Sequence, residues 1–326
     1  MRSSSKNFGD FGGNWTVVKL AAVTEYFSSF NRVLSKTPFK RVYIDAFAGG
    51  GRIKQTIEKK AGPKLTPGSD WFPEDSKLEE NSVAEEFEET ESIGFRHGSP
   101  LLALEANPGF DEFIFIERDQ AVLDQLKEQV KNAQSLQGRP VQFICEDANT
   151  ALSRICRPDW SKRFRATIFL DPFALQIHWA TLEKIARTKG MDMWMLFPAM
   201  AVNRMLPRNG KMPEVWAQRL NETFGDTTWR QEFYATPQIP QNDDLFPELL
   251  PNPQETKLDD PFGRLSRYVT RRLKTVFVDA VEEPLVLKTA LGAPLFLLCF
   301  AVANKKGAPI AKRIANHIIK NQNNGH

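Results

Sequence analysis

The sequence has 326 residues and a formal net charge of +3, with 41% hydrophobic and 25% charged residues. This composition is that of an ordinary soluble globular protein, and the net charge is too small to indicate nucleic-acid binding by itself. No run approaches the roughly 20 apolar residues that a membrane-spanning helix needs, which excludes a transmembrane helix.

Neither a metal site nor a secretory signal is predicted. Cys145, Cys156 and Cys299 lie far apart, and His97 and His178 have no metal-binding partners at useful spacing. The first residues lack the apolar stretch of a secretory signal. We therefore expect reduced thiols and a cytoplasmic protein with no metal site.

The chain begins with an amphipathic helix and a buried strand. Apolar residues recur at helical spacing over residues 15–34, which predicts the helix. A short apolar strand is predicted over residues 41–46, and it runs into the glycine cluster Gly49-Gly50-Gly51. Glycine lets the backbone take a positive φ and lacks the Cβ that would hold a nucleotide away. By itself the cluster therefore fits either an ordinary turn or a ligand-binding loop.

An insertion is predicted over residues 53–97, because a connection of this length is too long for a plain loop. It is strongly acidic over residues 74–91, and its part at 81–91 fits either a short solvated helix or a disordered segment. Regular structure resumes at Ser99 and Pro100, the predicted N-cap and first residue of a helix.

Buried apolar runs then alternate with helical patterns. The predicted strands are residues 111–119, 141–149, 166–173 and 191–198. Strands that alternate with helices at this spacing predict a parallel sheet covered on both faces.

The pattern changes in the last third of the chain. Residues 199–280 read as short helices and a proline-rich loop, with one longer helix over residues 264–277. A buried strand at 295–303 and a helix at 309–320 close the chain. We therefore predict one α/β domain over residues 1–326, doubly wound and mostly parallel. It carries the insertion after its first strand and a helical elaboration before its last strands.

Four acids fall at the carboxyl ends of successive predicted strands: Asp45, Glu117, Asp147 and Asp171. Ligands of open parallel sheets bind at this edge. A carboxylate that ends the second strand can accept both ribose hydroxyls of a nucleoside. A single acid in such a place is more often a helix cap, but four of them together with a glycine loop favour a ligand site.

Two kinds of cofactor fit such a site. The pyrophosphate of a dinucleotide rests on the N-terminus of a helix that follows the glycine loop directly. Here an insertion follows the glycines, and the sequence contains neither Gly-x-Gly-x-x-Gly nor a P-loop motif. S-adenosylmethionine has no phosphate and is therefore favoured, with a nicotinamide-dependent oxidoreductase as the weaker alternative.

Short motifs in order along the chain carry a family resemblance. They are Trp15-Thr16, Lys19-Leu20, the Tyr-Ile-Asp-Ala-Phe-Ala-Gly stretch at 43–49, Gly98-Ser99-Pro100-Leu101, Phe115-Ile116-Glu117, Leu170-Asp171-Pro172-Phe173 and Phe300-Ala301-Val302-Ala303-Asn304. With these motifs the sequence resembles class I S-adenosylmethionine-dependent methyltransferases and, more closely, the three-Cys-motif partner family. The resemblance covers nearly the whole chain and implies a seven-stranded, Rossmann-like methyltransferase sheet.

The resemblance also implies roles for individual residues. Asp45, Ala48 and Gly49 would face the methionine part of S-adenosylmethionine. Glu117 would hold the ribose hydroxyls, and Asp147 with Ala148 would contact the adenine. A separate three-Cys-motif protein is the partner that the family name implies.

The segment Asp171-Pro172-Phe173 is the predicted catalytic position, where the methyl acceptor would bind. It resembles the Asp-Pro-Pro-Tyr signature of enzymes that methylate exocyclic amines of bases. In that signature the acid orients the amine and the aromatic ring stacks on the base. Here the second proline is missing and the aromatic residue comes one place early. Both an amine and a ring position therefore stay open as acceptors, and a strand-ending turn in which Asp171 caps the next helix is the plain structural alternative.

Two functions follow from this sequence. The first is methyl transfer to a nucleic-acid base, with Arg264, Arg267, Arg271 and Lys274 as a basic face that would meet phosphates, although such a face is more often only solvated. The second is a non-catalytic partner of a three-Cys-motif protein that keeps the methyltransferase fold.

Overall fold

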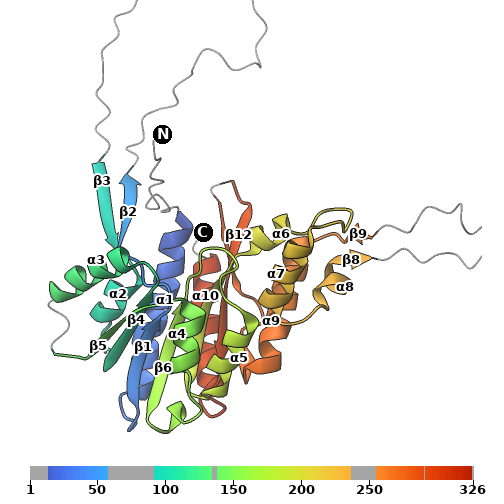
Figure 1. Cartoon of the computed structure of the whole chain (residues 1–326). Helices are drawn as coiled ribbons and strands as arrows, with labels where there is room; N and C mark the ends of the chain where they lie inside the picture. Colours follow the sequence, from blue (N-terminus) through green and yellow to red (C-terminus); the bar gives the residue numbers. More distant parts are fainter. Residues whose placement is uncertain (1–13, 58–91, 134–137, 236–254, 290, 325–326) are drawn as a thin grey trace, which may run out of the picture.

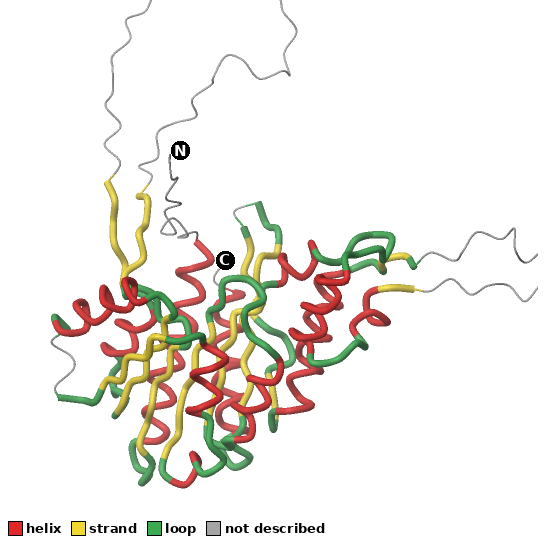
Figure 2. The backbone as a smooth tube through the Cα atoms, in the orientation of Figure 1, coloured by secondary structure: helices red, strands yellow, loops and turns green. Residues whose placement is uncertain are grey.

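A mostly parallel sheet with helices on both faces forms the centre of the protein (Figure 1). The computed structural model describes residues 14–57, 92–133, 138–235, 255–289 and 291–324. Figure 2 shows the strands of this sheet side by side, with the helices packed in front of it and behind it.

Five parallel strands make up most of the sheet: β1 (Lys40–Asp45), β4 (Glu112–Glu117), β5 (Val141–Cys145), β6 (Phe164–Leu170) and β7 (Met191–Phe197). Their order is β5-β4-β1-β6-β7, and β12 (Pro294–Val302) adds antiparallel to β7. The strand order therefore reverses direction between β1 and β6. In an open α/β sheet this switch point is where a ligand crevice forms.

The predicted fold class is confirmed, with one difference in the number of strands. The sheet has eight strands rather than seven, because two short strands pair with β12 on the same sheet: β10 (Asp279–Ala280) and β11 (Leu285–Lys288). The two short strands pair with successive parts of β12.

The inner parallel strands are mostly apolar, as expected of strands that helices cover on both faces. Every residue of β7 is buried, and so are the last five residues of β6. In the middle of the sheet Ile44 lies opposite Ile114 on one side and Ile168 on the other. Asp45, the last residue of β1, is thereby held at the carboxyl edge.

Two apolar cores lie on opposite faces of the sheet. One contains the buried sides of α1 (Asn14–Leu34), α2 (Ser99–Glu105), α3 (Gln120–Lys131) and α10 (Ala308–Asn324). The other contains those of α4 (Ala148–Ile155), α5 (Trp179–Arg187) and α9 (Pro261–Val276). The helices form because each has an apolar stripe at helical spacing that this packing removes from water.

The predicted insertion leaves and re-enters the domain through an antiparallel ribbon. Its strands are β2 (Arg52–Ile57) and β3 (Ser92–His97), and Figure 1 shows them projecting from the carboxyl edge of the sheet. At the base of the ribbon the Gly98 backbone N–H donates to the Gly51 carbonyl over 2.9 Å. The acidic stretch at 74–91 and the predicted helix at 81–91 lie outside the described residues.

The predicted start of α2 was wrong by one residue. Gly98, in an extended conformation, is the N-cap, and Ser99 is the first helical residue. The Ser99 side chain does not cap the helix but bonds to the carboxylate of Asp45.

The elaboration before the last strands contains α6 (Ala199–Arg204), α7 (Glu214–Phe224), α8 (Trp229–Phe233), α9 and the short pair β8 (Tyr234–Ala235) and β9 (Thr256–Lys257). Most of its predicted proline-rich loop, residues 236–254, lies outside the described residues. A single-turn 3-10 helix, Trp160–Lys162, precedes β6. None of the described helices is both long and apolar enough to cross a membrane.

Candidate functional site

A cleft of about 640 Å³ opens at the carboxyl ends of the strands. Its walls come from the first turns of α1, from the ends of β1, β4, β5, β6 and β7 with the loops that follow them, and from the start of β12. A volume of this size is in the range of small-molecule and cofactor sites. Its place beside the β1–β6 switch point is the one that the fold predicts for a ligand.

The glycine loop after β1 forms one wall of the cleft. Gly49 lines the cleft with a φ of +60°, and a Cβ built on it would meet no other atom within 4 Å. Gly51, at φ +81°, is confined instead, because a Cβ there would lie 2.9 Å from Leu126 Cδ1. Both positions need glycine for their backbone conformation, and at Gly49 the missing side chain also leaves room for a ligand.

Glu117, at the end of β4, bridges two loops through its carboxylate. Its Oε2 accepts a hydrogen bond from the Gly49 backbone N–H over 3.1 Å, and its Oε1 accepts one from the Asp119 backbone N–H over 3.1 Å. An ionised carboxylate has about four acceptor positions, so each oxygen can accept one more donor. This fixed, half-satisfied carboxylate suits a pair of neighbouring hydroxyls.

Asp147 and Ala148 follow β5 and also line the cleft. Asp147 is the N-cap of α4, where its Oδ1 accepts hydrogen bonds from the backbone N–H groups of Asn149 and Thr150 over 2.9 and 3.2 Å. The capping role explains the acid structurally. It also fixes the carboxylate at the cleft wall.

Asp45 and Ala48 are not among the residues that line the cleft. Asp45 is completely buried behind the glycine loop, where it accepts hydrogen bonds from the Tyr43 hydroxyl over 2.9 Å and the Phe47 backbone N–H over 3.2 Å. Burial raises the pKa of its carboxyl to about 6, although these bonds and the one from Ser99 oppose the rise. Asp45 thus holds the loop from behind.

Asp171, directly after β6, forms an ion pair with Lys19 of α1. Lys19 is only 4% exposed, and its ammonium lies 5.2 Å from the Trp15 ring centroid and 5.9 Å from that of Phe169. Asp171 does not cap the next helix, since α5 begins eight residues later at Trp179 and follows His178. The predicted capping of the next helix by Asp171 is therefore wrong.

Aromatic side chains flank this ion pair at the mouth of the cleft. Phe173 is 62% exposed, and its backbone N–H donates to Gln176 Oε1 over 2.9 Å. The following residue, Ala174, has a φ of +66°, a conformation that is costly for a residue with a Cβ. Trp15 and Phe296 pack at 4.8 Å between ring centroids and line the cleft with Phe173.

Thr16 adds an unsatisfied polar group to the cleft wall. Its side chain is buried, and its Oγ1 has no hydrogen-bond partner among the described residues. Buried hydroxyls in folded proteins usually have a partner, and Thr16 is the one such orphan among the described residues that line the cleft.

Four residues that were not predicted as site residues also line the cleft: Trp15, Lys19, Arg204 and Phe296. Lys19 had a readable signal, because it occupies the apolar face of its helix together with Ala22, Val23 and Tyr26. A lysine on a buried face needs an acidic partner. Arg204 and Phe296 had no such signal, since only tertiary structure brings α6 and β12 to the cleft.

The predicted basic face on α9 is paired with acceptors. Arg267 bonds Asp260 over 3.2 Å, Arg271 bonds Glu232 over 2.6 Å, and Lys274 pairs with Glu282. Arg264 donates to the carbonyl oxygens of Asp259 and Glu232. No group of three or more His, Cys, Asp or Glu side chains that could hold a metal ion occurs in the described part of the chain.

Solved structures with a similar chain course include several methyltransferases. An S-adenosylmethionine-dependent methyltransferase described as putative from Listeria monocytogenes has 10% identity, and the match covers 87% of this chain and 98% of that one with a TM-score of 0.37. A Legionella pneumophila protein has 15% identity, with 66% and 76% covered and a TM-score of 0.36. The plantazolicin methyltransferase BpumL, solved with S-adenosylhomocysteine, has 10% identity, with 89% and 86% covered and a TM-score of 0.30.

No family model matches the sequence. No curated protein matches it either. The case for a function therefore depends on the residues of the cleft.

Proposed function

We propose that this protein is an S-adenosylmethionine-dependent methyltransferase that acts on a nucleic-acid base. One observation carries the proposal: the Asp171–Lys19 ion pair and the exposed ring of Phe173 share a cleft with the glycine loop and Glu117. A group that orients an acceptor and a pocket for a nucleoside cofactor are thus side by side.

The chemistry of the donor set supports this cofactor. Glu117 offers two oxygens with free acceptor capacity to the vicinal hydroxyls of a ribose. Gly49 leaves open space where the methionine part would pass, and Asp147 with Ala148 would border the adenine. The orphan hydroxyl of Thr16 would gain a partner from the cofactor or from the acceptor. The similar methyltransferase structures named above add the same expectation.

When bound, S-adenosylmethionine supplies a methyl group on a sulfonium centre, which an acceptor electron pair can attack. The protein would act mainly by positioning, because holding the two reactants in line supplies much of the rate enhancement. Asp171 would accept a hydrogen bond from the amine or ring N–H of the base and so direct the nitrogen toward the cofactor. The Phe173 ring would stack on the base, a contact worth about 1–3 kcal/mol.

Lys19 is the positioning residue for Asp171. Its buried ammonium fixes one carboxylate oxygen, and it leaves the other oxygen, on a side chain that is 25% exposed, for the acceptor. Asp171 would act toward the base as the acceptor of the N–H hydrogen bond, as it already does toward the Lys19 ammonium.

Calorimetry with S-adenosylmethionine and transfer of a labelled methyl group to nucleic acid test the proposal together. The wild type is expected to bind the cofactor, and Glu117→Gln is expected to weaken binding by about tenfold, the effect of roughly 1.4 kcal/mol. Asp171→Asn is expected to keep cofactor binding and to lose most of the methyl transfer. Glu183→Gln, on the exposed side of α5, is a matched control that should change neither.

Three results distinguish the alternatives. Absence of cofactor binding at high micromolar concentration would sink the enzyme proposal. Cofactor binding without transfer to any nucleic acid would favour the partner of a three-Cys-motif protein. Methyl transfer that survives Asp171→Asn unchanged would remove Asp171 from the acceptor site.

A further inference from the structure

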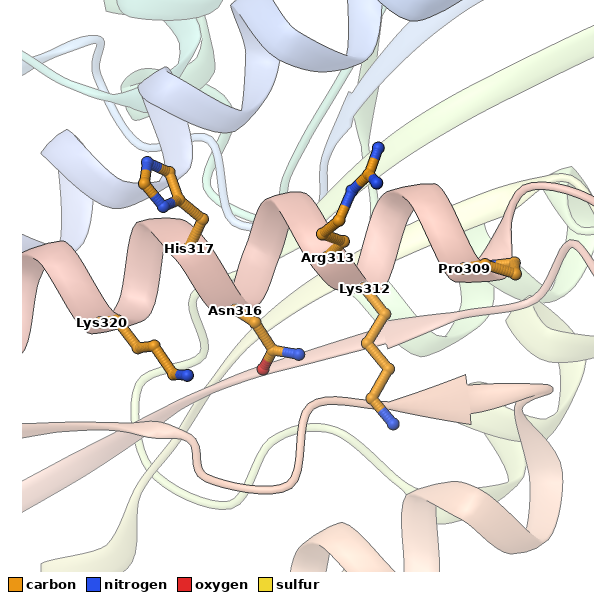
Figure 3. Close-up of a pocket in the computed structure, with 6 residues that line it drawn as sticks. All are labelled: Pro309, Lys312, Arg313, Asn316, His317 and Lys320. Carbon is orange, nitrogen blue, oxygen red and sulfur yellow. The ribbon is translucent and has the colours of Figure 1, made fainter.

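The outward side of α10 is a cationic helix surface with few acidic partners among the described residues. The helix has 17 residues and contains no Asp or Glu. Its buried side consists of alanines and isoleucines that pack on the sheet and on α1: Ala308, Ala311, Ala315, Ile318 and Ile319. Figure 3 shows the polar side chains that line the shallow hollow on the other side, among them Lys312, Arg313, His317 and Lys320.

Most of the cations of this face have no counter-ion. Lys312 bonds Asp279 over 2.9 Å and Glu282 over 3.3 Å. On the helix itself Arg313 and Lys320 are exposed and form no ion pair with any described residue. Lys305 and Lys306, in the turn before the helix, are likewise exposed without a described ion pair. Arg313 and Lys320 are called the α10 face below.

The basic residues of α9 are paired within the protein and those of the α10 face have no ion pair in the described chain, so α10 is the helix that is open to an external anion. The basic residues of α9 already have acidic or carbonyl partners within the protein, as described above. An incoming phosphate would have to displace them there. On the α10 face it would only displace water and loosely held counter-ions, and release of counter-ions is what drives phosphate binding.

The course of the chain connects the α10 face with the cleft. β12 runs antiparallel to β7, so α10 begins at the amino edge of the sheet and runs toward the carboxyl edge. α1 runs the other way, since it begins at the cleft with Trp15 and Thr16 and ends before β1. The two helices pack together, and Figure 1 shows the last turns of α10 at the end of the molecule where α1 begins.

We infer that the α10 face binds the phosphate backbone of the nucleic-acid strand whose base enters the cleft. The inference rests on the proposed function for its acceptor. Arg313 and Lys320 lie about 10 Å apart along the helix, which lets them contact different phosphates of one strand. Such contacts position the strand and carry no base preference, while the base is selected in the cleft.

Fluorescence anisotropy with a labelled single-stranded RNA of about 15 nucleotides, and with DNA of the same sequence, tests the inference. The variant Arg313→Ala/Lys320→Ala removes two cations from the α10 face, and Arg267→Ala/Arg271→Ala removes two from α9 as the matched control. Loss of two phosphate contacts should lower the slope of log affinity against log salt by about 1.4. If the variant and the wild type bind equally at about 1 M salt, this difference in slope makes the variant bind about 25-fold more weakly than the wild type at about 0.1 M salt.

The α9 control should keep the wild-type slope, and both variants should bind S-adenosylmethionine as the wild type does. Equal slopes for the wild type and the α10 variant, or a loss confined to the α9 variant, would overturn the inference. Binding of polyglutamate and of neither oligonucleotide would also overturn it and would assign the face to an acidic protein segment.

Methyl transfer to the same oligonucleotides separates this inference from the proposed function. Binding through the α10 face without any transfer keeps the docking surface and refutes the acceptor. Transfer that does not depend on the α10 face keeps the acceptor and refutes the docking surface. The RNA and DNA measurements show which backbone is bound.

Discussion

The Asp171–Lys19 pair joins the first helix of the protein to the fourth parallel strand, and its two members differ in exposure. The Lys19 side chain is 5% exposed and the Asp171 side chain is 25% exposed. Removing a partner of a buried ion pair strands the other charge, and the penalty grows with the burial of the charge that remains. The two single substitutions should therefore be unequal.

Asp171→Ala is expected to lower the free energy of unfolding by about 3 kcal/mol, because the lysine that remains is almost fully buried. Lys19→Met should cost less, since the remaining carboxylate still reaches water. The double variant Lys19→Met/Asp171→Leu should recover most of the loss, as an apolar pair of similar size leaves no charge unpaired. Urea unfolding of the wild type, the two single variants and the double variant measures these free energies. A loss in the double variant equal to the sum of the two single losses would contradict the prediction.

Gly49 and Gly138 allow a matched test of the glycine loop. Both have a positive φ, +60° and +75°, and a Cβ at either position would meet no other atom within 4 Å. Alanine at each position should thus cost a similar amount, about 1–2 kcal/mol of backbone strain. Only Gly49 lines the cleft.

Gly49→Ala is therefore expected to weaken S-adenosylmethionine binding by about tenfold, while Gly138→Ala leaves it unchanged. Thermal unfolding gives the stability cost of each substitution, and calorimetry gives the affinity. Equal affinities for the two variants would mean that the cofactor does not pass Gly49.

Among the elements, the ribbon of β2 and β3 meets the described part of the domain at its base, where His97 also contacts Glu105 of α2 over 2.9 Å. Arg52 lies opposite His97 in the ribbon, and the bond between Gly98 and Gly51 closes its base. Two directly paired strand residues can be joined by a two-residue hairpin turn. The ribbon is thus an appendage that the sheet does not need for its own pairing.

Replacing residues 53–96 by Asn-Gly is therefore expected to leave the thermal unfolding midpoint and cofactor affinity close to those of the full chain. Circular dichroism and calorimetry measure both quantities. A shortened chain that folds but no longer binds S-adenosylmethionine would show that the insertion supplies part of the cofactor site.

At the scale of the whole molecule, the buried acids set how stability depends on pH. Asp192, near the amino edge of the sheet, accepts a hydrogen bond from the Tyr26 hydroxyl over 2.7 Å, which ties α1 to β7. Burial raises the pKa of its carboxyl to about 7, and the Tyr26 bond and the charge of Arg165 only partly oppose this. The folded protein thus holds this proton more tightly than the unfolded chain does.

The contribution of Asp192 to stability is complete below the unfolded pKa of about 4 and is lost as the pH rises through about 7, an effect of up to about 4 kcal/mol. Asp192→Asn keeps an acceptor for Tyr26 and removes the charge. It should match the wild type near pH 4 and exceed it in stability at pH 8. Chemical unfolding over this pH range measures the difference.

Asp279→Asn is the control with the opposite sign. The hydrogen bond from Lys312 lowers the pKa of Asp279 despite the opposing effect of burial. This variant should be less stable than the wild type near neutral pH and should approach it in acid. A constant offset between wild type and Asp192→Asn at all pH values would refute the titration of Asp192.

Local patterns in the sequence were enough to predict the parallel part of the sheet. Apolar runs such as the one at 113–116 have no polar side for water, so they predict strands covered on both faces. The acids that end these runs mark the carboxyl edge, and Glu117, Asp147 and Asp171 do line one cleft. Asp45 does not, because it shares the side of β1 with Tyr43, toward α2. Neighbouring residues of a strand point to opposite faces of the sheet. The length of a predicted strand does not show which face its last residue occupies.

Contacts between distant segments lay beyond the sequence. Lys19 and Asp171 are separated by 152 positions, and the acids that neutralise α9 come from several different segments. The spacing of residues along the sequence describes one element at a time. It therefore predicted the basic side of α9 but not the acids that pair with it. The two short strands β10 and β11 were not predicted either, because they depend on pairing with β12.

The packing of α1 against α10 has a consequence for how the protein is made. α1 leaves the ribosome long before α10, because most of the domain lies between these two helices in the sequence. At about 5–20 residues per second, roughly 15–60 seconds of synthesis separate them. During that time α1 cannot pack against α10. Lys19 can pair with Asp171 only after the middle of the chain has emerged. The cleft therefore reaches its final form only after Phe296 has emerged to pack on Trp15, and a shorter nascent chain carries an incomplete cleft.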